Sequence, residues 1–248
     1  MAVGSILLAD DADAVARPML GAPVGIRALA ATLLPRQEVH AVMVAPLPVH
    51  ELLRKEADRF GLSELIDVLP SSLHAAEALA AALARLPADV DAVLVHDALV
   101  ALCPTAMVLR VLNAARVSGA ACPVLPLRGE IFVDGEELRT PQAGPLCLAQ
   151  PPMAFTRTSL QKVVERAGTA GLAAAALEAG VTLARVEGDR DAFRVKDGAD
   201  LTRALEVWGR RAPEFAFIWP RPSTREEEAT IITPGPSELN VTIPERPA

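Results

Sequence analysis

The chain has 248 residues, of which 51% are apolar and 22% charged, and its net charge is −7. This composition excludes a disordered chain, and the acidic balance argues against a nucleic acid partner, whose phosphates need a basic face. No apolar run reaches the roughly 18 to 20 residues that a membrane span requires, so we expect no membrane partner. Cys103, Cys122 and Cys147 lack metal-ligand spacing. With no signal-peptide pattern at the start, they favour a reducing cytoplasm.

Along the first half of the chain, short apolar runs alternate with segments of helical spacing. The apolar runs predict strands at Ser5–Ala9, Val39–Ala45, Ala92–His96 and Ala120–Leu125. The segments between them predict helices at Val24–Leu33, Val49–Phe60, Leu73–Leu86 and Pro104–Val117. Strands without polar alternation that alternate with helices predict an α/β fold, whose mostly parallel sheet is covered on both faces.

The alternation breaks between residues 126 and 149. The stretch "EIFVDGEELRT" is typical of a hairpin, with a turn at Asp134 and Gly135 between two strands. Inserted into an α/β pattern, it predicts a projecting β-hairpin arm. Its apolar side chains need cover, so we expect the arm to pair two copies into a homodimer.

The α/β pattern resumes after the arm. Helices are expected at Thr158–Ala167, Gly171–Ala179 and Ala199–Arg210, and strands at Val181–Val186 and, briefly, Phe193–Val195. We place the α/β domain at residues 1–212. Residues 213–248 begin with the strand-like run "EFAFIWP" and are then rich in Pro, Ser and Glu, which predicts an extended tail. Its islands "TIIT" and "NVTI" either dock along a surface, add to a sheet edge or stay solvated.

Two clusters carry candidate chemistry. The first is "DAVLVHDALV", a buried strand that ends at His96 and Asp97. In open α/β sheets ligands bind beyond the carboxyl ends of the strands, so Asp97 is placed to hold a ribose or Mg²⁺. The alternative is that Asp97 caps the next turn and His96 is a core residue.

The second cluster is Arg190, Arg194 and Lys196, which precede the last helix. Arginine binds phosphate through a bidentate fork and lysine as a point charge, so this cluster is a candidate phosphate site. The alternative is a solvated mixed-charge turn, because three aspartates are interleaved with the cations.

Taken in order, "VLVHDA", "QPPMAF" and "VEGDRDAFRVKDGADL" resemble the 2-C-methyl-D-erythritol 4-phosphate cytidylyltransferases, over residues 5 to 210. The resemblance implies a Rossmann-like nucleotidyltransferase fold and an arm that pairs two subunits. It also implies CTP and a small phosphorylated alcohol as substrates, release of pyrophosphate, and Mg²⁺ as cofactor when the enzyme is active.

The resemblance also implies residue roles. It assigns catalytic roles to Arg194 and Lys196, which hold phosphate, and to Arg17, which assists them, and it assigns Mg²⁺ to Asp97. It assigns nucleotide binding to Ala9, Asp10, Ser72, Asp97 and Ala98. Attack on the nucleotide's α-phosphorus is then in line.

The chain departs from the family at its first loop. The family has a glycine-rich loop with cations, whereas this chain has "LADDADAVARPM", with aspartates and no glycine. Two unit charges at about 4 Å interact by roughly 4 kcal/mol at an effective dielectric near 20. Repulsion in place of attraction therefore predicts that the family's transfer reaction is weak or lost.

Two questions stay open from the sequence. Asp10, Asp11, Asp13 and Asp97 either form an oxygen-rich cation site, or the loop aspartates are solvated and cap the next helix. Likewise, the chain is either a nucleotidyltransferase or a non-catalytic homologue that acts as a binding or scaffold protein with an active paralogue.

Overall fold

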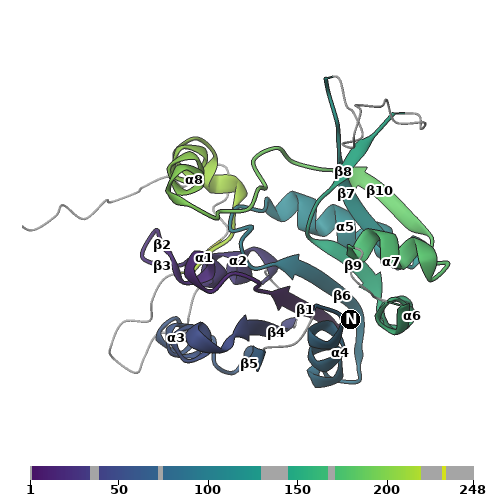
Figure 1. The fold of residues 1–248 in the computed structure, drawn as a ribbon, viewed down its shortest axis with the longest axis horizontal. Coiled ribbons are helices and arrows are strands. Elements are labelled where there is room, and N and C mark those ends of the chain that lie inside the picture. Colours follow the sequence, from purple (N-terminus) through teal and green to yellow (C-terminus); the bar gives the residue numbers. More distant parts are fainter. Residues whose placement is uncertain are drawn as a thin grey trace, which may run out of the picture.

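The computed structural model describes residues 2–33, 39–71, 75–129, 145–166, 171–218 and 231–232. Its main sheet is built from β1 (Ala2–Leu8), β4 (Val39–Pro46), β5 (Ile66–Ser71), β6 (Val90–Asp97), β7 (Ala120–Pro126), β8 (Cys147–Ala149), β9 (Met153–Thr156) and β10 (Leu183–Glu187). The strand order is β10-β7-β9-β6-β1-β4-β5, and β8 pairs with β7 off this path (Figure 1).

The sheet is mostly parallel, as predicted. β1 lies between β6 and β4, β5 pairs with β4, and β10 pairs with β7, all in parallel. Only β8 and β9 run antiparallel to their neighbours in this sheet. The predicted strands at the four apolar runs are confirmed within a few residues, whereas β5, β8 and β9 were not predicted as strands.

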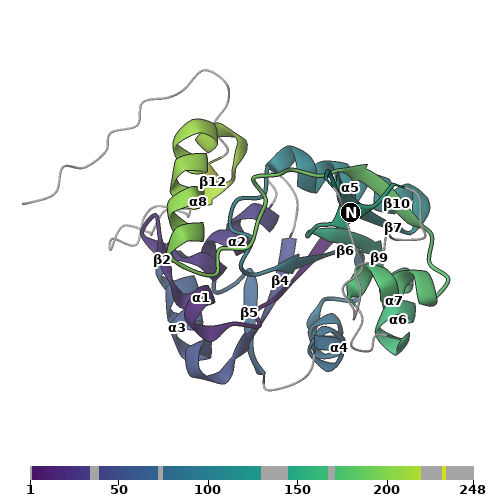
Figure 2. The same ribbon diagram turned by 45° about the horizontal axis from the view of Figure 1, so that its top comes forward.

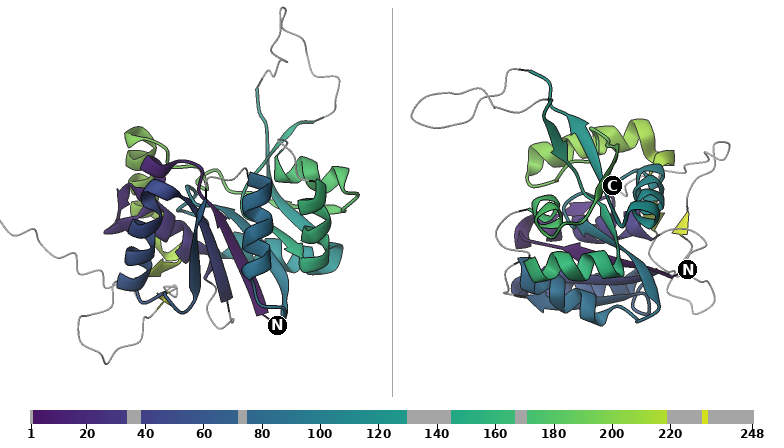
Figure 3. Two further views of the ribbon diagram at one scale, coloured as in Figure 1. Left: turned by 60° about the horizontal axis from the view of Figure 1, so that its bottom comes forward. Right: turned by 90° about the vertical axis from the view of Figure 1, so that its right-hand side faces the viewer.

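Helices cover both faces of the sheet. They are α1 (Ala12–Ala16), α2 (Val24–Thr32), α3 (Leu47–Arg59), α4 (Ala75–Arg85), α5 (Thr105–Ser118), α6 (Arg157–Arg166), α7 (Leu172–Glu178) and α8 (Gly198–Arg211). Along β1, Val3 and Leu7 pack in one apolar core with α2, α3 and α5, and Ile6 packs in the other with α4, α6 and α7. This alternation is what a strand between two helical layers requires. Figure 2 and the left view of Figure 3 show the two layers.

Part of the predicted arm is described. β7 and β8 pair as an antiparallel ribbon that leads away from the sheet (Figure 1). Residues 130–144, which include the predicted turn at Asp134 and Gly135, lie outside the described residues.

The segment that follows α8 folds back onto the domain. A 3-10 turn, η1 (Ala212–Glu214), leads to Phe215, which is buried and stacks on Trp208 with ring centroids 6.1 Å apart. β11 (Phe217–Ile218) then pairs with β12 (Ile231–Ile232), so the "TIIT" island adds to a strand, which was one of its predicted alternatives. A further short pair, β2 (Pro18–Met19) and β3 (Ala22–Pro23), forms the turn before α2.

One predicted strand is wrong. The chain at Phe193–Val195 forms no strand. Its amide at Val195 donates instead to the carbonyl of Leu99, in the turn after β6, at 2.9 Å. The apolar residues there are explained by packing, because Val195 is buried and Phe193 packs against the core.

Candidate functional site

The loops that follow β1 and β6 lie side by side at the carboxyl ends of these strands. Leu8 and Asp97 are register partners, the Ala98 amide donates to the Leu8 carbonyl at 3.0 Å, and the Ala9 amide donates to the Val44 carbonyl of β4 at 3.0 Å. The structure therefore brings together four of the five predicted nucleotide-binding residues, Ala9, Asp10, Asp97 and Ala98. The fifth, Ser72, lies outside the described residues.

Asp97 has partners for both carboxylate oxygens. Oδ1 accepts the amide of Leu99 at 2.9 Å, as the capping alternative predicted, and Oδ2 forms an ion pair with Nε of Arg194 at 2.8 Å. Burial raises the pKa of Asp97 above its ordinary value, although the Leu99 amide and the Arg194 guanidinium act in the opposite direction. This carboxylate is thus largely desolvated and depends on Arg194 for its charge balance.

Arg194 is shared between two carboxylates. Its Nη2 also contacts Oδ1 of Asp10, in the loop after β1. The side chains of Arg194, Asp10 and Asp97 are 32%, 66% and 23% exposed. The guanidinium that the sequence suggested for phosphate binding therefore sits between two aspartates of the same site.

The other two predicted cations lie close by. Arg17, just after α1, donates from Nη2 to the carbonyl of Lys196 at 3.4 Å. The Val195 amide holds this segment to the turn after β6, because it donates a hydrogen bond to the carbonyl of Leu99. The structure therefore gathers Arg17, Arg194 and Lys196 at one edge of the sheet.

The acidic loop does not form the four-aspartate cation site. Asp11 caps α1, because its Oδ1 accepts the amide of Ala14 at 2.9 Å, and Asp13 lies in the first turn of that helix. Among the described residues, no group of three or more His, Cys, Asp or Glu is placed to hold a metal ion. With both oxygens of Asp97 engaged, the residues present do not fit Mg²⁺ as they stand.

His96 belongs to the core rather than to the site. It is 1% exposed, and its Nε2 donates to the carbonyl of Val100 at 2.9 Å. Burial lowers the pKa of His96 to about 4, so the ring is neutral near pH 7. The core alternative for this residue is confirmed.

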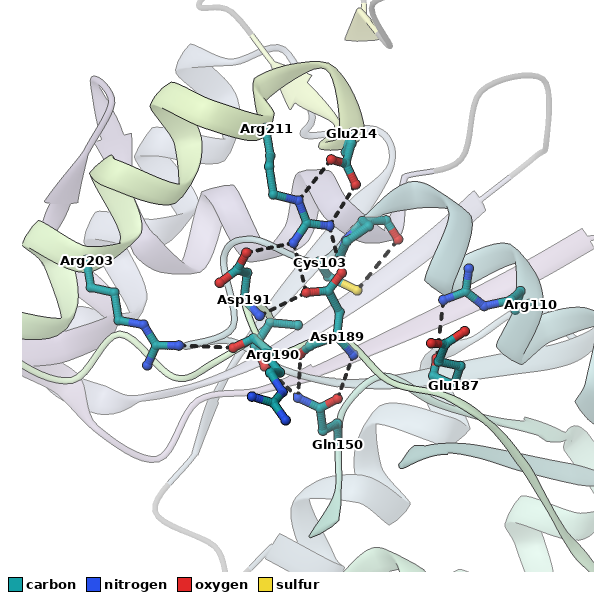
Figure 4. A network of polar contacts seen from close by, with 12 residues as sticks. Cys103, Arg110, Gln150, Glu187, Asp189, Arg190, Asp191, Arg203, Arg211 and Glu214 are labelled. Carbon is teal, nitrogen blue, oxygen red and sulfur yellow. Dashed lines mark hydrogen bonds and ion pairs between the residues drawn. The ribbon is translucent and has the colours of Figure 1, made fainter. Parts of the chain in front are cut away.

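Gln150 organises the approach to Arg194 and was given no role from the sequence. Its Nε2 donates to the carbonyls of Asp189 (2.8 Å) and Ala192 (3.0 Å), and its Oε1 accepts the amide of Asp189 at 2.9 Å (Figure 4). A Cβ at Gly188 would lie 2.2 Å from that Oε1 and 3.0 Å from the backbone carbonyl oxygen of Val124, so a larger residue here would displace the hydrogen-bonded Gln150 side chain. The sequence offered a hint of this role, since Gln150 opens "QPPMAF", one of the three stretches that carry the family resemblance.

The cluster around Arg190 is only partly as predicted. The carbonyl of Arg190 accepts from Arg203 at 3.1 Å, and the Arg203 guanidinium stacks on Phe193 at 3.8 Å. The interleaved Asp189 and Asp191 are not simply solvated, because both pair with Arg211 of α8 (Figure 4). From this segment, Arg194 pairs with Asp10 and Asp97, and Lys196 lies near enough to Asp97 to oppose the rise of its pKa.

Comparison with known proteins decides the family. The family model of 2-C-methyl-D-erythritol 4-phosphate cytidylyltransferase (IspD) matches residues 7–209. The chain belongs to the IspD family. The 2-C-methyl-D-erythritol 4-phosphate cytidylyltransferase of Streptomyces avermitilis is 30% identical over 215 residues, which cover 81% of this chain and 86% of that protein.

Other IspD relatives are longer. The bifunctional IspD/IspF enzymes of Bradyrhizobium sp. BTAi1 and Clavibacter michiganensis are each 32% identical, over 58% and 75% of this chain. The matches span 39% and 47% of those two proteins, so the chain corresponds to less than half of their length.

Solved structures confirm the predicted nucleotidyltransferase fold. The 4-diphosphocytidyl-2C-methyl-D-erythritol synthase of Anaerococcus prevotii aligns with a TM-score of 0.71 at 14% identity, over 84% of this chain and 99% of that one. The IspD of Thermus thermophilus aligns with a TM-score of 0.64 at 23% identity, over 81% and 97%. Within the described part of this IspD-family chain, no helix is long and apolar enough to cross a membrane.

Proposed function

We propose that this chain is a divergent cytidylyltransferase homologue in which transfer from CTP to 2-C-methyl-D-erythritol 4-phosphate is weak or lost. The observation that carries the proposal is the position of Arg194 between Asp10 and Asp97. A cation that would otherwise be open to phosphate is paired from within the protein. Family membership supports the reaction class, and the pairing of Arg194 with two aspartates supports weak or lost transfer.

A ligand phosphate has to compete with these two carboxylates. Both are attached to the loops next to Arg194, so they are present at high effective concentration. Displacing them breaks two ion pairs and leaves Asp97, which is largely buried, without its cation. The phosphate then also lies close to the displaced carboxylates, which repel it.

The charge of the whole site points the same way. The four aspartates of these loops (Asp10, Asp11, Asp13 and Asp97) and the three cations (Arg17, Arg194 and Lys196) together carry one net negative charge. A triphosphate is a polyanion, so it gains no long-range attraction from this edge of the sheet.

Residual transfer would follow the in-line course of the family. An oxygen of the substrate phosphate attacks the α-phosphorus of CTP, a new P–O bond forms, and the bond to the bridging oxygen breaks as pyrophosphate leaves. Arg194 and Lys196 would hold phosphate oxygens and Arg17 would assist, but only in molecules where Arg194 has left Asp10 and Asp97. The proposed setting is the cytoplasm.

A second candidate function is that of a non-catalytic partner, which pairs through the arm with another copy or with an active paralogue. The observation in its favour is apolar exposure at the base of the arm, where Leu127 and Leu148 are 44% and 52% exposed. Analytical ultracentrifugation tests it: a dimer that dissociates when both leucines are replaced by serine supports the pairing, and a monomeric parent protein excludes a homodimer.

Calorimetric titration of CTP in the presence of Mg²⁺ tests the main proposal. We expect a dissociation constant in the millimolar range, and no pyrophosphate release above background when 2-C-methyl-D-erythritol 4-phosphate is added. Micromolar binding with steady pyrophosphate release would show that the internal pairing of Arg194 is no obstacle, and the proposal would be wrong.

A further inference from the structure

The last residue of α8, Arg211, contacts the segment that carries Arg194 and Lys196. Figure 4 shows its guanidinium pointing from the helix end toward Asp189 and Asp191, with Glu214 of η1 on its other side. Arg211 and Glu214 both lie beyond residue 209, where the match to the IspD family ends. This contact therefore joins the chain beyond the matched region to the site segment.

Every N–H donor of Arg211 is used. Nη1 donates to Asp189 Oδ1 at 3.0 Å and to Asp191 Oδ2 at 2.7 Å. Nη2 donates to Asp189 Oδ2 and Glu214 Oε2, both at 2.7 Å, and Nε donates to Glu214 Oε1 at 2.9 Å. The rigid fork of arginine permits two bidentate pairs at once, which lysine does not. With all its donors engaged within the protein, the Arg211 guanidinium is a structural cross-link, called a tie below, and not a phosphate ligand.

The carboxylates respond to this tie. The hydrogen bond from Arg211 holds the pKa of Asp189 and of Glu214 below the ordinary values, and the same contacts raise the pKa of Arg211. The side chains of Arg211, Asp189 and Asp191 are only 21%, 19% and 22% exposed, so solvent screens the pairs less than at an open surface.

Arg211 is one of several anchors of this segment, which also include Arg203 at the Arg190 carbonyl, and Arg17 and Asp200 at the backbone of Lys196. Residues 188–196 form no helix or strand. The contacts described for the segment's backbone include those from Gln150 to Asp189 and Ala192, and that from Val195 to Leu99. Asp191 lies three residues before Arg194, so a tie at Asp191 limits where the Arg194 side chain begins.

We propose that Arg211 is a positioning residue, which fixes the Asp189–Lys196 segment so that Arg194 stays between Asp10 and Asp97. Without Arg211, Asp189, Asp191 and Glu214 form a cluster of three carboxylates without the guanidinium they share, and their repulsion displaces the segment. The relevance to ligand binding rests on the proposed function, whereas the fixing of the segment does not.

Amide hydrogen exchange and NMR of the full chain test this inference. In Arg211→Gln we expect exchange at the Val195 amide to accelerate about tenfold or more, while amides of β1 and β6 keep their rates. The Nε–H signal of Arg194 should also shift toward that of a solvated arginine, which a purely structural loss of stability does not require. Arg210→Gln, an exposed neighbour on α8, is the charge-matched control and should leave both signals unchanged.

Two further variants separate local positioning from general stability. Glu214→Gln should lower the melting temperature yet preserve Val195 protection, because Arg211 keeps both aspartates. Asp191→Asn removes the negative charge that pairs with Arg211 on the segment itself and should accelerate Val195 exchange even if Arg211→Gln does not fold. Unchanged Val195 exchange in Asp191→Asn, or equal acceleration throughout β1 and β6 in Arg211→Gln, would overturn the inference.

The two proposals fail separately. Micromolar binding of CTP by the parent protein overturns the proposed function and leaves the positioning role intact if the exchange results hold. Conversely, an Arg194 signal that does not respond to loss of Arg211 overturns the positioning role, whatever the affinity for CTP.

Discussion

Replacing Asp10 with asparagine should strengthen the binding of CTP. Asparagine keeps the size of the side chain and removes its charge, so Arg194 loses one of its two carboxylate partners while Asp97 keeps its own. The loop after β1 keeps its helix cap, because that bond comes from Asp11. The substitution therefore changes the charge at one contact and leaves the surrounding fold in place.

The expected size of the effect follows from exposure. The Arg194 and Asp10 side chains are 32% and 66% exposed, so their pair contributes at most about 1 kcal/mol after solvent screening. Removing the carboxylate also removes its repulsion of a bound phosphate, roughly 0.5 kcal/mol for each pair of unit charges about 8 Å apart in water. Together these amount to about 1.5 kcal/mol, or roughly a tenfold gain in affinity.

Asp13→Asn is the matched control for this prediction. It makes the same change in net charge, in the first turn of α1, at a side chain for which no contact with Arg194 is described. At an ionic strength of about 0.1 M its long-range effect is largely screened, so we expect a gain of about twofold or less. Calorimetric titration of CTP with Mg²⁺ measures both variants. Equal gains in the two variants, or no gain in Asp10→Asn, would refute the reasoning.

Three other predictions concern the framework of the site. Arg157→Ala, at the start of α6, removes three hydrogen bonds to carbonyls at and just after the end of α4, and should lower the free energy of unfolding in urea by about 2 kcal/mol. Arg166→Ala, at the exposed end of α6, should change it by less than about 0.5 kcal/mol. Gly188→Ala should cost about 2 kcal/mol or more because its Cβ meets a side-chain oxygen at 2.2 Å, while Gly198→Ala, with no atom within 4 Å, should be nearly neutral in the same assay. The NMR titration of His96 should show no protonation until the pH approaches 4. Because the pKa of His96 in the folded chain lies below its ordinary value, the stability that the neutral ring contributes is complete above about pH 6.5 and declines as the pH falls from there toward 4. A titration midpoint above pH 6 would contradict the burial of His96.

The sequence allowed most of the sheet to be predicted because its central strands are continuous apolar runs. β5 escaped because it lies at the sheet edge and includes Asp67 and Pro70, which interrupt both strand patterns. β9 escaped because four residues are too few to show a period. At Phe193–Val195 a strand was predicted where none forms, because apolar side chains that pack on the core resemble those of a strand that joins the sheet.

At the site, the sequence could identify the residues but not their pairing. Asp97 and the late cations are found by their places after a strand and before a helix. The contact of Arg194 with Asp10 spans 184 positions, and either residue alone is as compatible with a bound ligand as with an internal partner. The role of Arg211 could not be predicted from the sequence. It is one of two adjacent arginines at the end of a helix, and only the folded chain shows which of the two contacts Asp189.

Phe215 bears on how this protein can be shortened or joined to others. The ring lies six residues past the matched family region, yet it is 1% exposed, stacks on Trp208, and its backbone bridges to Pro104 before α5. A chain cut after residue 209 would leave a hole of aromatic size beside Trp208, a loss of about 3 to 5 kcal/mol by analogy with buried phenylalanines replaced by alanine. A second domain fused at the C-terminal side of this one would therefore have to be attached downstream of Phe215, or supply an aromatic ring of its own to fill that place.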